Sequence, residues 1–361
     1  MFALRLYQRY LMRETFAAIF LVLLAFLALF SFFDLINELR SVGRGGYKFA
    51  HAIAYVALSL PGALYELIPV AALIGTLYAL STLARHSEIT VLRASGLATR
   101  DILLTLFRVA GLLAVLTFLV GEVLVPFSGR TAAELKARAL SKVITQRGMT
   151  SGVWLKDGNS FINIRTATAD AQLAGLRIYR FNEDRVLHSV TDAESASYEP
   201  PGRWILKGVV RTILEGENAR VERTDTAEWQ SAVNPDLLAV LMVSPERMSL
   251  PGLLDYSRHL AQNRQKAERY QIAIWKKLVY PFAALVMVAL ALPFGYSHNR
   301  VGGVSLKIFA GVMLGILFYA LNGLSSNLGV INSWPPFASA VAPSAMFLLL
   351  AMAMLWWVER R

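Results

Sequence analysis

The sequence has 361 residues, of which 55% are hydrophobic and only 17% are charged, and its formal net charge is +11. Soluble domains are nearer to about 45–50% apolar and about 25% charged. This composition excludes a purely soluble enzyme, a disordered chain and a collagen-like fibre. The sequence contains no cysteine, which excludes disulfides, thiolate metal sites and cysteine nucleophiles. Cysteine usage therefore gives no indication of an oxidising or a reducing compartment.

The charges are distributed unevenly along the chain. Residues 128–271 hold 20 of the 36 Lys and Arg and 17 of the 25 Asp and Glu. The segments on either side are therefore charge-poor and apolar. This pattern predicts an integral membrane protein with one water-soluble insert.

Six apolar segments have about the length that a helix needs to cross the hydrocarbon core. The uncharged run from Ile308 to Val358 is too long for one span, and Pro335–Pro336 and several Asn divide it into two. The first segment lacks a small-residue cleavage site, so we interpret it as an uncleaved span. The predicted spans are Thr15–Phe33, Ile53–Thr82, Ile102–Val125, Leu278–Ser297, about Ile308–Ser326 and Phe337–Val358.

Basic residues in the short loops predict the orientation, because cytoplasmic loops are enriched in Lys and Arg. With both termini in the cytoplasm, ten basic residues lie inside and three, Arg40, Arg44 and Lys48, lie outside. The charged insert is then periplasmic. Lys276 and Lys277, at the outer end of the fourth span, contradict this rule, and either snorkelling to the interface or a functional role explains them.

The insert changes to a period of two after a polar helical continuation of the third span over residues 128–145. The segment Val153–Ile164 contains Asp157–Gly158–Asn159, which is typical of a β-hairpin. Further strand candidates are Leu176–Val190, Ala193–Tyr198, Trp204–Ile213 and Ala219–Trp229. Short strands at this spacing predict an antiparallel sandwich or roll whose exposed edge could accept a partner strand.

A polar helix is predicted over Met248–Ala273, where the chain returns to the membrane. Ser249 suits its N-cap, and Pro251 falls near its first turn.

Motifs for catalysis are missing from this sequence. It contains no Gly–Lys dipeptide and hence no P-loop, and its five His have no pair at metal-ligand spacing. Glu66 and Glu122 lie at or near membrane depth, which keeps an intramembrane enzyme open, although Glu122 is close enough to the outer end of its span to snorkel. We therefore expect no catalytic residues, no bound metal and no cofactor in this chain.

The loop between the second and third spans contains a short amphipathic helix, predicted over about residues 84–96, that ends at Gly96. Two interpretations stay open. In one, the helix only anchors two spans, and Glu88 bonds to Arg85. In the other, it is a coupling helix that docks into a separate ATPase through Glu88, Arg85, Ile89 and Leu92.

The outer end of the first span combines basic and aromatic side chains. Arg40 and Arg44 are one helical turn apart, so both could contact one anionic headgroup. Phe26, Phe30 and Phe33 are spaced by four and three residues, which places them on one helical face. This stripe either packs against a neighbouring span or lines a lipid cavity that has a basic roof.

Several separate segments, in the same order, carry a resemblance to a known family. The chain resembles the LptF/LptG family of lipopolysaccharide-transport permeases from end to end, and within it the G branch. The segments are SEITVLRASGL (Ser87–Leu97), GVWLKDGNSFINI (Gly152–Ile164), IYRFNEDRVLHSV (Ile178–Val190), RYQIAIWKKL (Arg269–Leu278) and APSA (Ala342–Ala345).

This resemblance implies an α-helical membrane protein of six transmembrane helices with an inserted all-β, β-jellyroll-like periplasmic domain. The implied domains are residues 1–127, 128–271 and 272–361. It also implies half of an ABC exporter in the inner membrane that moves lipopolysaccharide from the outer leaflet toward the outer membrane. The implied partners are a homologous LptF-type permease, two copies of an LptB-type ATPase that bind ATP and Mg, an LptC-type bitopic protein and an LptA-type periplasmic bridge.

The resemblance also carries site residues onto this sequence. It matches Glu88 to the coupling glutamate, and Arg40 and Lys136, with Arg138 nearby, to basic residues at the lipid headgroup. Asp34 and Ser41 stand where related proteins have basic residues, so the headgroup contacts are expected to be redistributed to Arg44, Lys276 or Lys277. The acyl-chain cavity is expected to involve Phe26, Phe30, Phe33, Leu314, Phe318 and Leu321.

Three other functions compete with lipid export. A mechanotransmitting ABC subunit would share the coupling helix but need neither an aromatic cavity nor a basic rim. A membrane-anchored β-domain scaffold would tolerate the loss of Glu88. A lipid-modifying enzyme would require an essential carboxylate.

Overall fold

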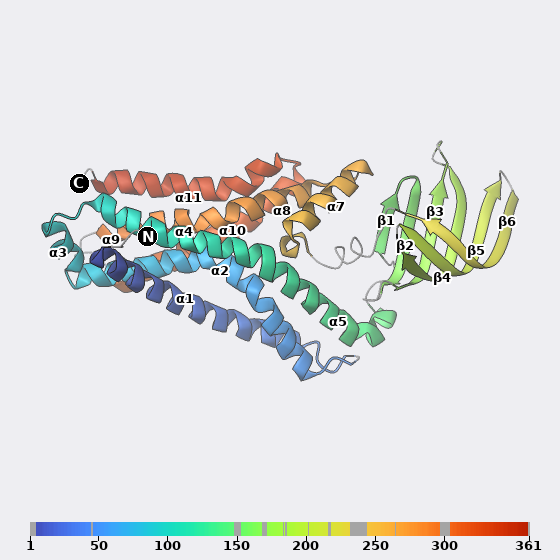
Figure 1. The fold of residues 1–361 in the computed structure, drawn as a ribbon, viewed down its shortest axis with the longest axis horizontal. Coiled ribbons are helices and arrows are strands. Elements are labelled where there is room, and N and C mark those ends of the chain that lie inside the picture. The colour runs from blue at the N-terminus through green and yellow to red at the C-terminus, as the bar shows by residue number, and fades with distance from the viewer. Residues whose placement is uncertain are drawn as a thin grey trace.

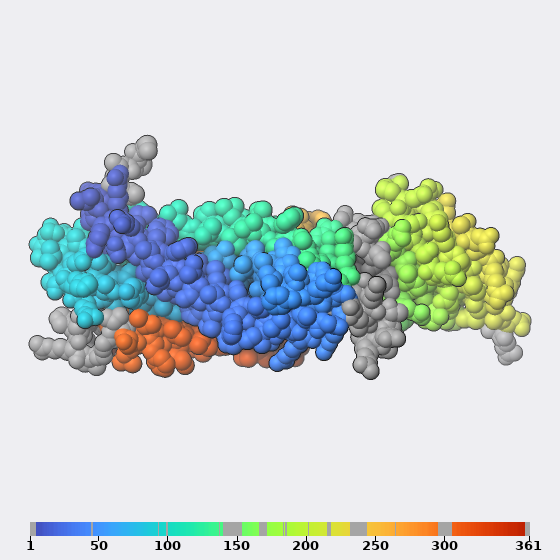
Figure 2. All heavy atoms as spheres, turned by 90° about the horizontal axis from the view of Figure 1, so that it is seen from below, coloured from blue at the N-terminus to red at the C-terminus, as the bar shows by residue number. Residues whose placement is uncertain are grey.

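The computed structural model describes residues 5–44, 46–147, 153–167, 172–182, 184, 186–200, 202–215, 218–231, 244–263, 265–296 and 304–359. The molecule is elongated (Figure 1), with a bundle of long helices at one end and a β-sheet at the other. Figure 2, seen from below, shows the same separation: the strands lie at the end opposite the start of α1 and the loop between α2 and α4.

Six helices of the described residues are long and apolar enough to cross a membrane, which confirms the predicted number of spans. Two of them are formed by more than one helical element. The helices are α1 (Leu6–Leu39), α2 (Phe49–Arg85), α4 (Thr99–Leu119) with the π-helical turn η1 (Val120–Leu124) and α5 (Val125–Arg147), α8 (Glu268–Val279) with the 3₁₀ turn η3 (Tyr280–Phe282) and α9 (Ala283–Tyr296), α10 (Val304–Ile331), and α11 (Pro336–Glu359).

The helix α2 is the centre of the bundle and packs against α1, α5, α9 and α10. Its residues from Leu67 to Leu83 are almost all buried, although Pro61 and Pro69 lie inside it. Proline is tolerated in membrane helices because neighbouring groups satisfy the freed backbone. Glycines bring the helices close: a Cβ on Gly75 would lie 2.5 Å from Ile19 Cα, and one on Gly315 would lie 2.5 Å from Val70 Cγ1.

The insert forms one antiparallel sheet of six strands in the order β1-β2-β3-β4-β5-β6. One face holds the apolar core, which includes Ile162, Ile178, Trp204 and Trp229. The predicted hairpin is confirmed, with Asp157 opposite Ser160 and Gly158 at a φ of 57°. The strands are β1 (Val153–Asp157), β2 (Ser160–Ala167), β3 (Gln172–Phe181), β4 (Leu187–Glu199), β5 (Arg203–Glu215) and β6 (Asn218–Gln230).

The prediction of an all-β insert is thus confirmed, and the structure adds the strand order, which the sequence did not predict. Each described strand pairs only with its neighbours in sequence, so these strands form a meander that is not closed into a barrel. A two-layered sandwich, which the spacing of the strands also suggested, is not formed by the described residues.

The return to the membrane consists of two helices where the sequence predicted one. A 3₁₀ turn, η2 (Pro245–Arg247), precedes α7 (Leu250–Gln262), and α8 begins only at Glu268 as the start of the fourth span. The predicted N-cap is confirmed, because Ser249 Oγ accepts from Gly252 N at 3.4 Å. We call residues 244–263 the strap.

The strap contacts the sheet at its far end. Gly158 N in the β1–β2 turn donates to Asn263 Oδ1 at 3.0 Å, and Lys156 Nζ donates to Asn263 O at 3.3 Å. The predicted domain boundaries at 127/128 and 271/272 fall inside continuous helices, so the bundle and the insert share α5 and α8.

Candidate functional site

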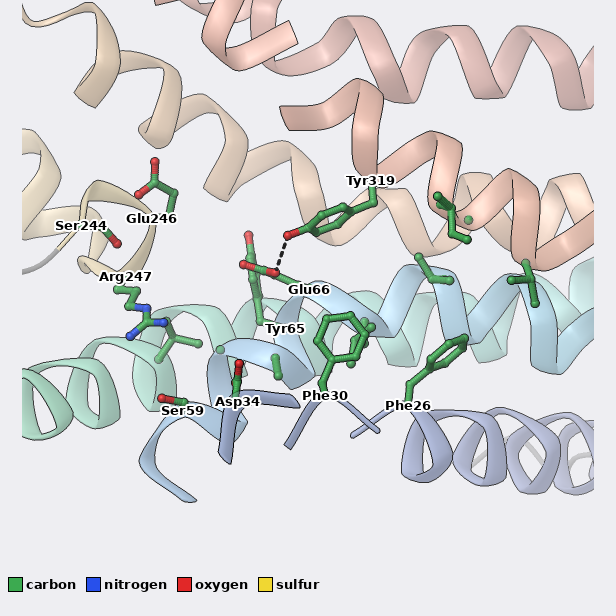
Figure 3. A pocket seen from close by; sticks show the side chains of 18 residues that line it. Phe26, Phe30, Asp34, Ser59, Tyr65, Glu66, Ser244, Glu246, Arg247 and Tyr319 are labelled. Atoms are coloured by element: carbon green, nitrogen blue, oxygen red, sulfur yellow. Dashed lines mark hydrogen bonds between the residues drawn. The ribbon is translucent and has the colours of Figure 1, made fainter. Parts of the chain in front are cut away.

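A cavity of about 530 Å³ opens where α1, α2, α10, the start of α5 and η2 meet (Figure 3). Its wall is amphipathic. The larger apolar side chains are Phe26, Phe30, Leu67, Val70, Val125, Val312 and Ile316, and the charged or hydroxyl-bearing ones are Asp34, Ser59, Tyr65, Glu66, Ser244, Glu246, Arg247 and Tyr319.

The polar and apolar residues of this cavity are partly segregated. In Figure 3, Phe26 lies toward one end, whereas Asp34, Ser59 and Arg247 lie toward the other. Helical spacing explains this along α1, because Phe26, Phe30 and Asp34 recur every four residues and so face the same side. A ligand with an apolar body and a charged or polar head suits such a wall.

Glu66 projects into the middle of the cavity. Tyr319 Oη donates to Glu66 Oε2 at 3.4 Å, and Tyr280 Oη donates to the Glu66 backbone oxygen at 2.7 Å. These bonds join α2 to α10 and to η3. The sequence marked Glu66 as unusual but gave it no role.

The predicted acyl-chain residues divide into two groups. Phe26 and Phe30 line the cavity, whereas Phe33 does not; it is 54% exposed and its ring contacts Phe32 edge-on. Leu314, Phe318 and Leu321 lie in the core between α9, α10 and α11, where the Phe318 ring packs edge-on against Phe347. The cavity face of α10 is instead formed by Val312, Gly315, Ile316 and Tyr319.

Lys136, one of the predicted headgroup residues, already has a protein partner. Its Nζ lies 2.9 Å from Glu38 Oε1 and 4.6 Å from the centre of the Tyr55 ring. Arg138 lies 3.9 Å from Glu134 on the same helix. Arg40 and Arg44 are both exposed, but α1 ends at Leu39, so they do not continue its helical face.

The two lysines of the fourth span are also bonded within the chain. Lys277 is buried; its Nζ lies 3.2 Å from Glu122 Oε2 and donates to the Met248 backbone oxygen. Lys276 Nζ donates to the Asn322 backbone oxygen at 3.4 Å. Neither lysine lines the cavity described here.

Arg247 is the basic side chain that does line the cavity, among the residues the structure describes. The sequence analysis missed it because it lies in a polar segment of the insert with no periodic pattern. Ser244, Glu246 and Arg247 reach the cavity only because η2 folds back against the bundle, where the Arg247 side chain lies beside Gly129 of α5.

The short helix predicted in the loop between the second and third spans is observed as α3 (Glu88–Ala94), and Gly96 follows it at a φ of 91°. Ile89 is buried in one cluster with Leu11, Leu83 and Leu106, so it fixes the helix to the bundle. Arg85 is exposed and Leu92 is half-buried.

Glu88 bonds to a residue that the sequence analysis missed. Tyr10 Oη, on α1, donates to Glu88 Oε2 at 2.7 Å. The alternative bond between Glu88 and Arg85 is not formed in the structure, in which both residues are described. Because the two partners are far apart in the sequence, no local pattern could have indicated this contact.

Known proteins resemble this chain over almost its full length. The family described as "Lipopolysaccharide export system permease LptF/LptG" matches residues 9–357. The lipopolysaccharide export system permease protein LptG of Escherichia coli strain K12 is 32% identical over 359 residues, which cover 98% of each chain. LptG of Haemophilus influenzae is 29% identical over 357 residues, again 98% of each chain. LptF of Escherichia coli K12 is 24% identical over 335 residues, covering 89% of this chain and 87% of its own.

Proposed function

The chain belongs to the LptF/LptG family of lipopolysaccharide export permeases, and we propose that it is the G-type subunit of an ABC exporter that extracts lipopolysaccharide from the outer leaflet of the inner membrane. It is a multi-pass inner-membrane protein and a permease subunit. The observation that supports the finer proposal is the amphipathic cavity, whose wall offers both an apolar surface and charged groups.

The cavity would hold the lipid in two parts. Acyl chains would contact the apolar wall around Phe26, Phe30 and Ile316, where burial of apolar surface stabilises them. A headgroup phosphate would bind the Arg247 guanidinium through charge-assisted hydrogen bonds. The exposed Arg40 and Arg44 at the end of α1 remain candidates for outer headgroup contacts.

The chain would obtain its energy from partners. We propose a homologous LptF-type permease that completes the cavity, two copies of an LptB-type ATPase that bind ATP and Mg, an LptC-type bitopic protein and an LptA-type bridge. The relatives named LptF and LptG support the pairing of two homologous permeases. Both termini would lie in the cytoplasm and the sheet in the periplasm, following the positive-inside rule.

The helix α3 would transmit the work of the ATPase. Glu88 would meet a basic residue of that ATPase, with Arg85 and Leu92 beside it, while Ile89 keeps the helix fixed to the bundle. Closure of the ATPase dimer would move α3, narrow the cavity and favour movement of the lipid toward the sheet. Each of these steps requires that the lipid bind the open state more tightly than the closed one.

The proposal is tested by extracting the complex from native membranes in mild detergent and identifying its proteins and lipids by mass spectrometry. We expect an ATPase, a homologous second permease and lipopolysaccharide to accompany the chain. Recovery with an ATPase but without glycolipid would favour a mechanotransmitting subunit. Recovery of the chain alone would favour a membrane-anchored scaffold.

A further inference from the structure

Two charged residues that the sequence marked separately as unusual form one buried ion pair. Lys277 Nζ on α8 lies 3.2 Å from Glu122 Oε2 in η1, and the two side chains are only 7% and 21% exposed. Removing one partner of a buried pair leaves an uncompensated charge, which is strongly destabilising. The pair therefore links the position of α8 to the position of η1.

Both members of the pair also bond to the beginning of the strap. Glu122 Oε1 and Oε2 accept from Leu250 N at 3.0 and 3.2 Å. Lys277 Nζ donates to the Met248 backbone oxygen. Leu250 is the first residue of α7, whose amide N–H has no partner within the helix, and a carboxylate is favoured at that end by the helix dipole.

The π-helical turn explains why Glu122 points at the strap. A π turn inserts one residue into an α-helix and rotates the following side chains, and such turns are frequent at functional sites. The preceding Gly121 lets the turn lie close to α2, since a Cβ there would lie 2.5 Å from Tyr65 Cε2. Tyr65 in turn lines the cavity.

The strap residues that line the cavity directly precede these bonds. Ser244, Glu246 and Arg247 reach the cavity, and Met248 and Leu250 are bonded to the ion pair. The rest of the strap packs on α8 through Leu253, Tyr256 and Leu260.

We propose that the Glu122–Lys277 pair is a latch that seats the strap on the rim of the cavity and so positions Arg247 over the bound lipid. Lys277 is then a positioning residue and not a lipid-binding one. The functional consequence rests on the proposed lipid export, whereas the latch itself can be measured without transport.

A test uses the natural lack of cysteine in this chain. Met248 is 4% exposed and lies at the latch, so Met248→Cys, in the full permease complex in membranes, reports detachment of the strap through its rate of maleimide labelling. The variants are Glu122→Gln, Lys277→Met and the double variant. Glu122→Gln keeps an oxygen that can accept from Leu250 N and removes only the charge.

Each single variant is expected to raise the labelling rate by about fivefold or more and to lower the recovered lipopolysaccharide by a similar factor, because one buried charge stays unpaired. The double variant leaves no charge unpaired, so its effect on the labelling rate is expected to be smaller than the two single effects combined, but the rate should stay above that of the parent because the latch itself is gone. As a matched control, Asp255→Asn removes an exposed ion pair with Arg258 on the same strap and should leave both measurements unchanged.

Parent-like labelling in both single variants would overturn the latch. If the single variants do not accumulate, accumulation itself is the readout: rescue in the double variant supports the pair, and no rescue contradicts it. A parent complex that carries no lipopolysaccharide would contradict the proposed function, while the labelling series would still decide the latch.

Discussion

Single side chains account for two departures from what the sequence led us to expect. At the end of the bundle that holds α3, the partner of Glu88 is Tyr10 of α1. Because Phe26, Phe30 and Asp34 on the same helix line the cavity, this hydrogen bond connects α3 to a wall of the cavity. We therefore interpret Tyr10 as a residue that holds the Glu88 carboxylate in position for the ATPase.

Tyr10→Phe tests this interpretation. Tyr10→Phe removes a hydrogen bond to a carboxylate, which contributes about 1 kcal/mol. The complex should therefore hydrolyse about twofold to fivefold more ATP for each lipid molecule that it releases. The measurement is lipid release from proteoliposomes at matched ATP turnover. Tyr78→Phe, at an equally exposed tyrosine of α2, is the control, and a Tyr10→Phe complex that matches it would contradict the role of Tyr10.

At the other end of α1, the bond between Lys136 and Glu38 changes the expected effect of a Lys136 variant. Glu38 is 8% exposed, so Lys136→Met would leave the Glu38 carboxylate buried without its partner. We expect this to lower the free energy of unfolding by about 1–3 kcal/mol. The loss is smaller than for a fully buried pair because Lys136 is 34% exposed. We expect a lower thermal unfolding midpoint, which Glu38→Gln in the same chain partly restores. If Lys136 serves only the lipid, the second substitution should restore nothing.

Arg247 is the residue for which the structure predicts a direct loss of lipid. Arg247→Gln removes the positive charge from the cavity wall, and a charge-assisted hydrogen bond contributes about 1.5–3 kcal/mol, so lipopolysaccharide recovered with the complex should fall at least about tenfold. Arg258→Gln, at an exposed arginine of the same strap, is the control. Equal recovery from both variants would exclude Arg247 from the headgroup site.

At the scale of the elements, the contact between α2 and α10 closes one side of the cavity. This contact requires a glycine, because any side chain at that position would collide with α2. A Cβ on Gly315 would lie 2.5 Å from Val70 Cγ1, so Gly315→Ala should push the helices apart and cost about 1–3 kcal/mol. Val70→Ala in the same chain should recover part of this loss, measured as the unfolding midpoint in detergent. Gly323→Ala, where no atom lies within 4 Å, should have little effect, and a midpoint for Gly315→Ala equal to that of Gly323→Ala would contradict the close contact.

The elements themselves were largely predictable because their signals are local. Apolar runs of sufficient length indicated the six spans, Asp157–Gly158–Asn159 indicated a hairpin, and Ser249 indicated the start of α7. The site was less predictable because its residues come from distant parts of the chain. Glu122 and Lys277 each looked like an exception to a membrane rule, and only the packing of η1 against α8 explains both.

At the scale of the whole molecule, the strap is the connection between the cavity and the sheet. Its first residues line the cavity, and its last, Asn263, bonds to the β1–β2 turn through its side chain and to Lys156 of β1 through its backbone oxygen. A movement of the strap would therefore move the sheet relative to the bundle. If lipid passes from one to the other, loosening this last contact should slow transfer without emptying the cavity.

Asn263→Ala makes that distinction. It removes the acceptor of Gly158 N and, within the strap, the Asn263 Nδ2 bond to the His259 backbone oxygen, but it leaves the Asn263 backbone oxygen to Lys156. With photo-crosslinking groups placed separately at Phe26 in the cavity and at Phe161 in the sheet, we expect unchanged lipid crosslinking at Phe26 and a decrease of about threefold at Phe161, which corresponds to the loss of one hydrogen bond of about 0.6 kcal/mol. A decrease at both positions would show that Asn263 acts on loading, and no decrease at either would exclude the strap as the connection between cavity and sheet.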